Sequence, residues 1–178
     1  MATHDVNFGP GLATGMFYHA PKGTALPTYP SETLAADWVE VGDISEDGIT
    51  WTPFGDIQQL KNWAKVTKRA YANERGSISA PIISTTEESL KTVFGSVTHT
   101  AASTQHGVLD AVEVTNSLPD AEAYLFLMKD DDDLFMLGTT DGIITSLADV
   151  EFSPTGAITW TPTIEGDWTF VKDDGQTA

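Results

Sequence analysis

The pentapeptide ITWTP occurs twice in this chain, at residues 49–53 and again at residues 158–162. Apolar and hydroxyl side chains alternate in it, so on a β-strand Ile49 and Trp51 point to one face and the threonines to the other. A turn signal precedes each copy, and the proline is expected to end the strand because it has no N–H to donate. We therefore interpret the two copies as equivalent strands with similar environments at the edge of the core.

Similar short patterns, separated by turn residues, recur along the rest of the chain. They lie at residues 37–44, 77–84, 110–117, 123–129, 133–140, 143–153 and 167–174. About nine short strands of this kind indicate an antiparallel β-barrel or β-sandwich. Two copies of a pentapeptide do not indicate a solenoid, because repeat architectures need a fixed short period and at least three units.

One segment, STTEESLKTVFG at residues 84–95, predicts an α-helix that flanks the sheet. Ser84 or Thr85 is expected to be its N-cap, with a glutamate three residues further on completing a capping box. Gly95 is placed to end it. Three apolar side chains share one face of this helix: Leu90, Val93 and Phe94. A helix this short is not stable alone in water, so we expect that face to pack on the sheet.

The segment YLFLMKDDDDLFMLG, at residues 124–138, predicts a hairpin with large apolar side chains on both faces of each arm. Strands of this kind are buried on both sides. The sequence leaves open whether both faces are covered within one subunit or one face is covered by a neighbouring subunit. The aspartates at residues 130–133 lack the glycine and distal glutamate of an EF-hand loop, so we interpret them as a solvated hairpin tip.

The composition predicts one globular domain. The chain has 178 residues, of which 40% are hydrophobic and 20% charged, and no cysteine. We expect a single domain over residues 1–178, with an extended N-terminal arm (about residues 1–30) and a long internal excursion (about residues 56–75). No run of about eighteen apolar residues and no signal peptide is present, which argues against membrane insertion and classical secretion. The missing thiols exclude disulfides and cysteine metal sites.

Charge is distributed unevenly along the chain. The net charge is −7 over residues 1–60, +3 over residues 61–109 and −13 over residues 110–178, which together give −17. A basic segment, KNWAKVTKRAYANER at residues 61–75, therefore lies between acidic segments. One interpretation is a solvated surface; the other is self-complementarity, in which this segment meets an acidic face of another copy. Tight duplex binding is disfavoured, because it requires many basic contacts.

No motif predicts catalysis, a metal ion or a cofactor. The four histidines are scattered and show no metal-binding spacing. Ser103, His106 and Asp110 lie within a short span, but these residue types often occur together by chance. The glycines at residues 9–15 lack the order of a phosphate-binding loop.

The order of several segments resembles a known family. These segments are GLATGMFYHAPKGTALPT (11–28), WVEVGDIS (38–45), SISAPIISTTEESLKTVFG (77–95) and LADVEFSPTGAITWTPTIEG (147–166). Together with the tryptophan-bearing excursion, they make the chain similar to the major tail tube proteins of long, non-contractile-tailed bacteriophages, particularly those of actinobacterial hosts. The resemblance covers nearly the whole chain and depends on the order of loose motifs.

The resemblance implies a structural virion protein and not an enzyme. Family members have a β-sandwich or small barrel flanked by a helix, form hexameric rings through sheet edges and stack these rings into a tube for genomic DNA. Implied partners are further copies of the chain and the tape measure, tail terminator and distal tail or baseplate proteins. The implied location is the phage tail, with assembly in the host cytoplasm.

The resemblance also indicates which residues form subunit contacts. In the family, extended N-terminal and internal segments contact neighbouring rings, and residues 1–29 and 56–75 match these segments; they include Gly15, Ala20 and Gly23. The expected interface residues are Tyr18, Pro21, Lys61, Trp63, Lys65, Lys68, Arg69 and Arg75.

Electrostatics supports this interpretation independently. A conduit for DNA must not bind the duplex, and an acidic lining repels it. We expect the lining acids in the C-terminal third and the basic segment between subunits. The alternatives are another phage or secretion structural subunit, such as a capsid-decorating or type VI-like ring protein, and a small ligand-binding β-sandwich.

Overall fold

The computed structural model describes most of the chain outside its first residues. The described residues are 17–30, 33–45, 47–55, 57–61, 67–71, 75–100, 111–117, 119–130, 133–150, 152 and 158–173. They form twelve strands and one helix, α1 (Glu87–Phe94). The strands are β1 (Phe17–Pro21), β2 (Val39–Gly42), β3 (Thr50–Thr52), β4 (Ile57–Lys61), β5 (Thr67–Tyr71), β6 (Gly76–Ser79), β7 (Gly95–Thr100), β8 (Ala111–Asn116), β9 (Glu122–Asp130), β10 (Asp133–Leu147), β11 (Pro162–Gly166) and β12 (Thr169–Asp173).

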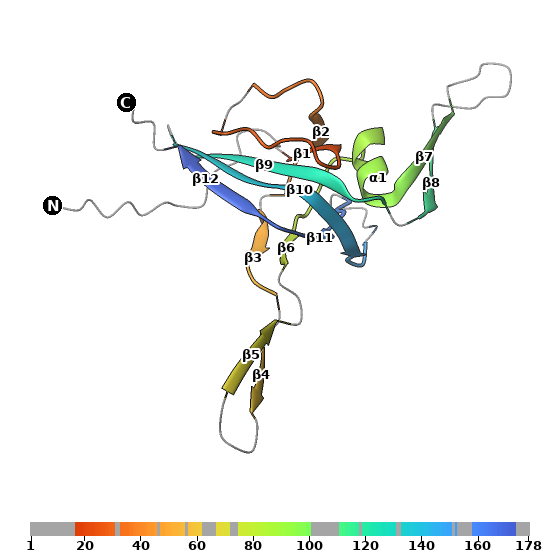
Figure 1. The fold of residues 1–178 in the computed structure, drawn as a ribbon. Helices are drawn as coiled ribbons and strands as arrows, with labels where there is room; N and C mark the ends of the chain where they lie inside the picture. Colours follow the sequence, from red (N-terminus) through yellow and green to blue (C-terminus); the bar gives the residue numbers. More distant parts are fainter. Residues whose placement is uncertain are drawn as a thin grey trace, which may run out of the picture.

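The body of the molecule is an antiparallel sheet of eight strands in the order β2-β1-β9-β10-β11-β6-β3, with β12 also paired to β10 (Figure 1). The long strand β10 shifts register between Thr139 and Gly142. Its first part pairs with β9 and β12, and its last part pairs with β11. The irregularity lets one strand serve two halves of the sheet, because a bulge bends and twists a strand.

The main core lies between these halves and under α1. It combines Phe17 and Phe126 with Ile78 and Ile164 from the other half, all at most 1% exposed. The rings of Phe17 and Phe126 stack with their centroids 4.4 Å apart. This arrangement confirms the predicted fold class, a mainly β sandwich with one flanking helix.

The β9–β10 hairpin is buried on both faces within one subunit. Tyr124 and Phe126 belong to the main core, whereas Leu125 and Leu127 belong to a second cluster on the opposite face. That cluster is completed by Ala20, Trp38 and Met136, with Leu26 and Leu34 packed against it. The segment that follows β1 thus covers this face, so these residues need no neighbouring subunit to bury them. Asp131 and Asp132 of the expected tip lie outside the described residues.

Helix α1 forms where the sequence predicts it, but the predicted N-cap is wrong. Thr86 is the N-cap: its hydroxyl accepts the backbone N–H of Ser89 at 3.2 Å, and the Ser89 hydroxyl accepts the backbone N–H of Thr86 at 2.9 Å. Serine thus takes the place expected for glutamate in the capping box. The Ser84 hydroxyl instead accepts the backbone N–H of Asp43 at 2.8 Å, and Thr85 lies near the Trp160 indole.

The other end and the apolar face of α1 follow the prediction. Gly95 ends the helix with a φ of 72°, a left-handed conformation that glycine adopts without strain. A side chain there would also meet the backbone of Pro119. Leu90 and Val93 are buried, and Phe94 packs against the main core.

The two copies of ITWTP are not equivalent, which corrects the interpretation from sequence. The first contains β3, an exposed strand paired with β6. In the second, Trp160 is buried and forms an isolated bridge with Ile82. Pro162 begins β11 instead of ending a strand; a first position is acceptable for proline, and its carbonyl accepts the N–H of Ala80 at 3.2 Å.

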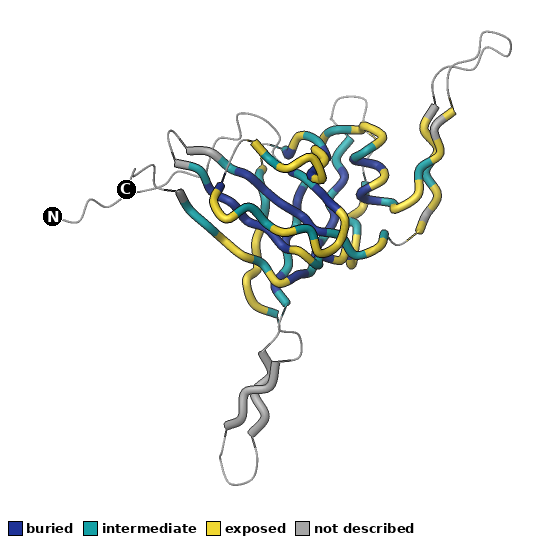
Figure 2. Tube along the Cα trace, turned by 45° about the horizontal axis from the view of Figure 1, so that its top comes forward, coloured by how far each residue is buried: buried dark blue, intermediate teal, exposed yellow. Residues whose placement is uncertain are grey.

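Two hairpins project from the body in different directions (Figure 1). The β4–β5 hairpin lies within the expected excursion, and the β7–β8 hairpin follows α1; each is a two-stranded sheet of its own. Figure 2 shows buried residues concentrated in the central strands and α1, while much of β7–β8 is exposed. Within the described part of the chain, no helix has the length and apolar character needed to cross a membrane.

Candidate interaction surfaces

The described part of the basic segment forms one projecting hairpin. Lys61 is the last residue of β4, and Lys68 and Arg69 lie on β5, opposite Leu60 and Gln59. Two further expected contact residues of this segment, Trp63 and Lys65, lie outside the described residues, as does Gly15, whereas Arg75 is described and lies at the end of the segment. The fold therefore brings Lys61, Lys68 and Arg69 together on an element that extends away from the body (Figure 1).

The expected contact residues of the N-terminal segment lie on β1. Tyr18 pairs with Glu40 and Leu125 and packs against the second cluster. Burial raises the pKa of its hydroxyl, and the charge of Glu40 raises it further. Pro21 is exposed, and its carbonyl accepts two hydrogen bonds from Thr24, at 3.0 Å from the backbone N–H and 2.7 Å from the hydroxyl. Ala20, in contrast, is 2% exposed.

Arg75 is engaged within its own subunit. Its Nη2 atom lies 3.2 Å from Oδ2 of Asp141 and donates to the Asp141 carbonyl oxygen at 2.9 Å. Lys22 approaches the same carboxylate, with Nζ 3.0 Å from Oδ1. Hydrogen bonding to Lys22, followed by the charges of Lys22 and Arg75, holds the pKa of Asp141 below its usual value against the opposing effect of burial. A role of Arg75 between subunits stays a prediction.

An aromatic strip, defined here as Trp51, Phe170 and Phe135, joins the strands β3, β12 and β10. Trp51 and Phe170 are partly exposed, whereas Phe135 is 7% exposed. The ring centroids of Trp51 and Phe170, and those of Phe170 and Phe135, are each 6.1 Å apart. Lys172 places its Nζ 5.5 Å from the centroid of the Phe135 ring, a cation–π geometry. Sequence reasoning missed this strip, because the three rings come from segments that are distant along the chain.

In the eight-stranded sheet, three strands have an edge without a strand partner among the described residues. They are β2 and β3 at the two ends of the sheet and β12, which pairs only with β10. Such edges present backbone N–H and C=O groups that can pair with another chain. They are therefore candidate sites for association between copies.

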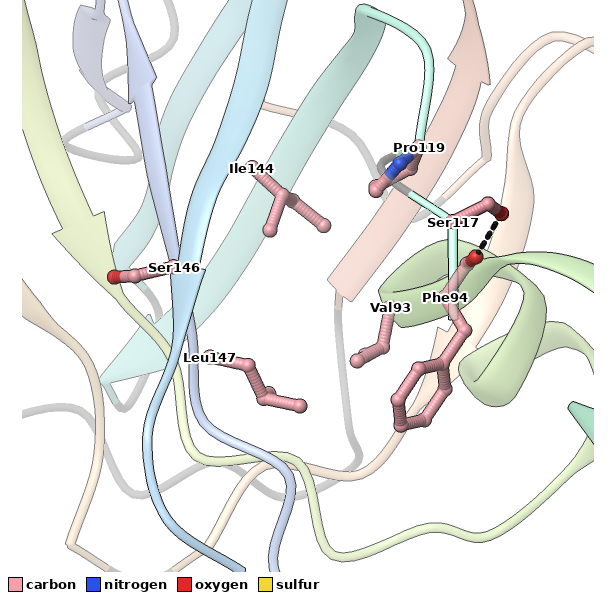
Figure 3. Close-up of a pocket in the computed structure, with 7 residues that line it drawn as sticks. All are labelled: Val93, Phe94, Ser117, Pro119, Ile144, Ser146 and Leu147. Atoms are coloured by element: carbon pink, nitrogen blue, oxygen red, sulfur yellow. Dashed lines mark hydrogen bonds between the residues drawn. The ribbon is translucent and has the colours of Figure 1, made fainter. Parts of the chain in front are cut away.

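An apolar pocket of about 280 Å³ lies between the end of α1 and the end of β10 (Figure 3). It is lined by Val93, Phe94, Ser117, Pro119, Ile144, Ser146 and Leu147. The Ser117 hydroxyl donates to the carbonyl of Phe94 at 2.7 Å. The lining side chains include no titratable group, so this pocket suits apolar packing and does not supply a general acid or base. The pocket could not be predicted from the sequence, since the lining residues come from three separate segments.

His19 is the histidine with the most specific environment in the described part of the chain. It is 7% exposed; its Nδ1 lies 2.9 Å from a carboxylate oxygen of Glu122 and its Nε2 lies 3.6 Å from one of Glu88. These contacts link β1 to β9 and α1, so we interpret His19 as a residue that supports the fold. No cluster of three or more potential metal ligands is found among the described residues. Ser103, His106 and Asp110 lie outside them.

The comparison with protein-family models gives a match over most of the chain. The family model described as "Phage tail tube protein" matches residues 12–161. None of the curated proteins matches this chain.

The chain is also similar to several solved structures. The structure "Virion of native gene transfer agent (GTA) particle" has 13% sequence identity and a TM-score of 0.41, covering 78% of this chain and 92% of the other. The "anti-feeding prophage cap (AFP tube terminating cap)" has 12% identity and a TM-score of 0.41 and covers 100% of both chains. The sheath-tube complex of an "Extracellular Contractile Injection System" has 9% identity and a TM-score of 0.36, covering 97% and 99%. At these TM-scores the likenesses carry no functional conclusion.

Proposed function

The chain belongs to the phage tail tube protein family, and on that premise we propose that its copies associate into hexameric rings that stack into the tube of a phage tail. The family match over residues 12–161 is the observation that carries this proposal. It makes the chain a structural component of the virion. Ring formation, stacking and the partners at the two ends of the tube are the proposed steps beyond it.

The shape and charge of the subunit support association between different surfaces of identical copies. Open edges at β2, β3 and β12 lie on the body, while β4–β5 projects from it (Figure 1). The projecting hairpin carries Lys61, Lys68 and Arg69, whereas the whole chain has a net charge of −17. A basic hairpin that meets an acidic body in the next copy gives a head-to-tail contact, which generates rings and stacks.

The net charge also fits a passage for DNA. Basic side chains lining a bore would bind phosphates and release counterions, which would hold the duplex in place. An acidic lining repels the duplex and lets it slide. We place the basic hairpin between subunits for this reason, and acids of the C-terminal third toward the bore.

In this proposal the chain is not an enzyme and needs no cofactor. Its partners are further copies of itself and the tape measure, tail terminator and distal tail or baseplate proteins that limit the tube. Assembly takes place in the host cytoplasm, and the finished tube is part of the virion tail.

Electron microscopy of the purified protein tests the proposal. We expect tubes built of stacked six-fold rings. Isolated rings or capsid-binding trimers would support a different phage structural subunit, and a monomer retained on a glycan column would support a ligand-binding β-sandwich. Either outcome would overturn the proposal.

Charge reversal on the basic hairpin tests which element joins the copies. The triple variant Lys65→Glu, Lys68→Glu and Arg69→Glu should reduce tube formation at least about tenfold while the subunit stays folded. The hairpin would then repel the acidic surface of the next copy. The matched comparison uses two double variants, Lys68→Glu with Arg69→Glu and Lys91→Glu with Lys129→Glu. The second alters the net charge equally but lies outside the hairpin and outside the open edge strands. Normal tubes from the hairpin variant would show that the hairpin is not the contact.

A further inference from the structure

Three segments that are distant in the sequence meet at Asp141. Lys22 follows β1, Arg75 precedes β6, and Asp141 lies in the irregular part of β10 between Thr139 and Gly142. We call Lys22, Arg75 and Asp141 the clamp. Its carboxylate lies 3.0 Å from Lys22 Nζ and 3.2 Å from Arg75 Nη2, and the Asp141 carbonyl accepts a further bond from Arg75 at 2.9 Å.

The backbone around the clamp is also fixed. The N–H of Gly23 donates to the carbonyl of Thr140 at 2.8 Å, next to Asp141. The Asp141 N–H lies 3.4 Å from the hydroxyl of Thr139, which is 1% exposed. The carboxylate therefore has a defined position on the body, and its partners are held relative to that position.

The clamp lies where the β4–β5 hairpin joins the body. Arg75 is the residue directly before β6, on the chain returning from β5. The next residue, Gly76, accepts a hydrogen bond on its carbonyl from the Trp168 indole at 3.2 Å. A side chain at Gly76 would lie 2.9 Å from the carbonyl oxygens of Thr52 and Pro53, which belong to the chain leading to β4. The outgoing and returning chains are thus packed together at the base of the hairpin.

We propose that Asp141 and Arg75 are positioning residues for assembly, because they fix the direction in which the β4–β5 hairpin leaves the body. The inference rests on the proposed function, in which this hairpin contacts an acidic surface of a second copy. A hairpin that is already oriented in the free subunit loses less conformational entropy when it docks. Without the clamp, the same contacts form from a wider range of directions and association is weaker.

The clamp is expected to matter little for the stability of the fold. The side chains of Lys22, Arg75 and Asp141 are 58%, 28% and 40% exposed. Ion pairs with this exposure contribute little to the free energy of unfolding, because water and salt screen them. A defect in assembly with an unchanged melting temperature therefore separates positioning from a general structural role.

The test compares Asp141→Asn with Asp149→Asn, which makes the same charge change at an exposed position for which the described residues show no ion pair. Asp141→Asn should raise the protein concentration at which tubes appear by about threefold, since the effect is limited by the free energy of ion pairs of this exposure. Its melting temperature should stay within about 2 °C of the unaltered protein. Asp149→Asn should leave both quantities unchanged, and Asp141→Glu should restore most of the assembly.

A distance measurement reports the direction of the hairpin itself. The chain has no cysteine, so spin labels can be attached through Gln59→Cys on β4 and Asp120→Cys on the body. In the free subunit, Asp141→Asn should broaden the distribution of distances between the labels by about twofold. Arg75→Gln, which disrupts the clamp from its other side, should broaden it similarly and provides the test if Asp141→Asn fails to fold.

The outcomes are distinct. If the unaltered protein forms no tubes, the proposed function fails and this inference fails with it. If it forms tubes and Asp141→Asn assembles like Asp149→Asn, only the inference is overturned. Weaker assembly without a broader distance distribution also overturns it, because the effect would then not arise from the direction of the hairpin.

Discussion

The two copies of ITWTP occupy opposite kinds of environment. Trp51 is 38% exposed on β3, at the end of the sheet, and stacks on Phe170 of the aromatic strip. Trp160 is 8% exposed, and its ring centroid lies 5.4 Å from that of Phe94 and 6.4 Å from that of Phe152. Its indole N–H points to the Thr85 hydroxyl at 3.4 Å. Identical pentapeptides therefore form an exposed edge strand in one place and part of the core in the other.

The difference shows what each tryptophan does for the fold. Trp160 forms backbone hydrogen bonds with Ile82 at 2.7 and 2.8 Å and contacts Phe94 at the end of α1, so it holds the helix against the sheet. Trp51 lies on an edge strand that pairs only with β6 among the described strands. We expect the free energy of unfolding to depend more strongly on Trp160 than on Trp51.

The largest expected effect is that of Trp160→Ala. Removing this buried ring should lower the free energy of unfolding by about 3–5 kcal/mol, through lost burial and the cavity left behind. The matched variant Trp51→Ala should lower it by only about 1–2 kcal/mol, because the ring is partly in water in the folded state and its removal leaves no closed cavity. Urea unfolding followed by circular dichroism measures both. Equal losses would mean that the two environments do not differ in energy as their burial indicates.

A smaller effect is expected from Thr85→Val, which removes the hydroxyl near the Trp160 indole. The free energy of unfolding should fall by about 1 kcal/mol, because a largely buried N–H loses its partner. Thr50→Val, a threonine-to-valine change beside the exposed Trp51, should change the free energy of unfolding by less than about 0.5 kcal/mol. A neutral Thr85→Val would show that the 3.4 Å contact contributes nothing.

The smallest effect concerns the stacking of Trp51 on Phe170. A double-mutant cycle with alanine at both positions should give a coupling energy of about 0.5–1 kcal/mol, the range for aromatic pairs beyond simple burial. Lys172→Ala combined with Trp51→Ala provides the control, since Lys172 contacts Phe135 instead. A coupling of zero between Trp51 and Phe170 would mean that the first copy is a solvated strand whose ring packs on nothing in solution.

Much of the fold was predictable because it depends on local periodicity. The apolar residues Leu90, Val93 and Phe94 share one face of any helix, and the β9–β10 hairpin has no polar face to expose. The N-cap was not predictable to the residue, because three consecutive hydroxyl residues compete for it. Contacts with Asp43 and Trp160 occupy Ser84 and Thr85 and leave Thr86 as the cap.

The candidate interaction surfaces were predictable only in part. The clustering of Lys61, Lys68 and Arg69 follows from their proximity in the sequence and is kept by the β4–β5 hairpin. The clamp and the apolar pocket were not foreseen, since each joins residues from several separate segments. For Arg75, the charge could be read from the sequence but the partner could not, because Asp141 lies on a strand far along the chain.

Local sequence was sufficient to predict the class of fold, the helix, the doubly buried hairpin and the charge of the excursion. These properties depend on side chains a few positions apart, whose relative directions are set by backbone geometry. Long-range contacts in the folded chain determine which tryptophan of the repeated pentapeptide is buried and which acid pairs with Arg75. Burial and ion pairing depend on what lies opposite a side chain in space, and identical local sequences carry no information about that.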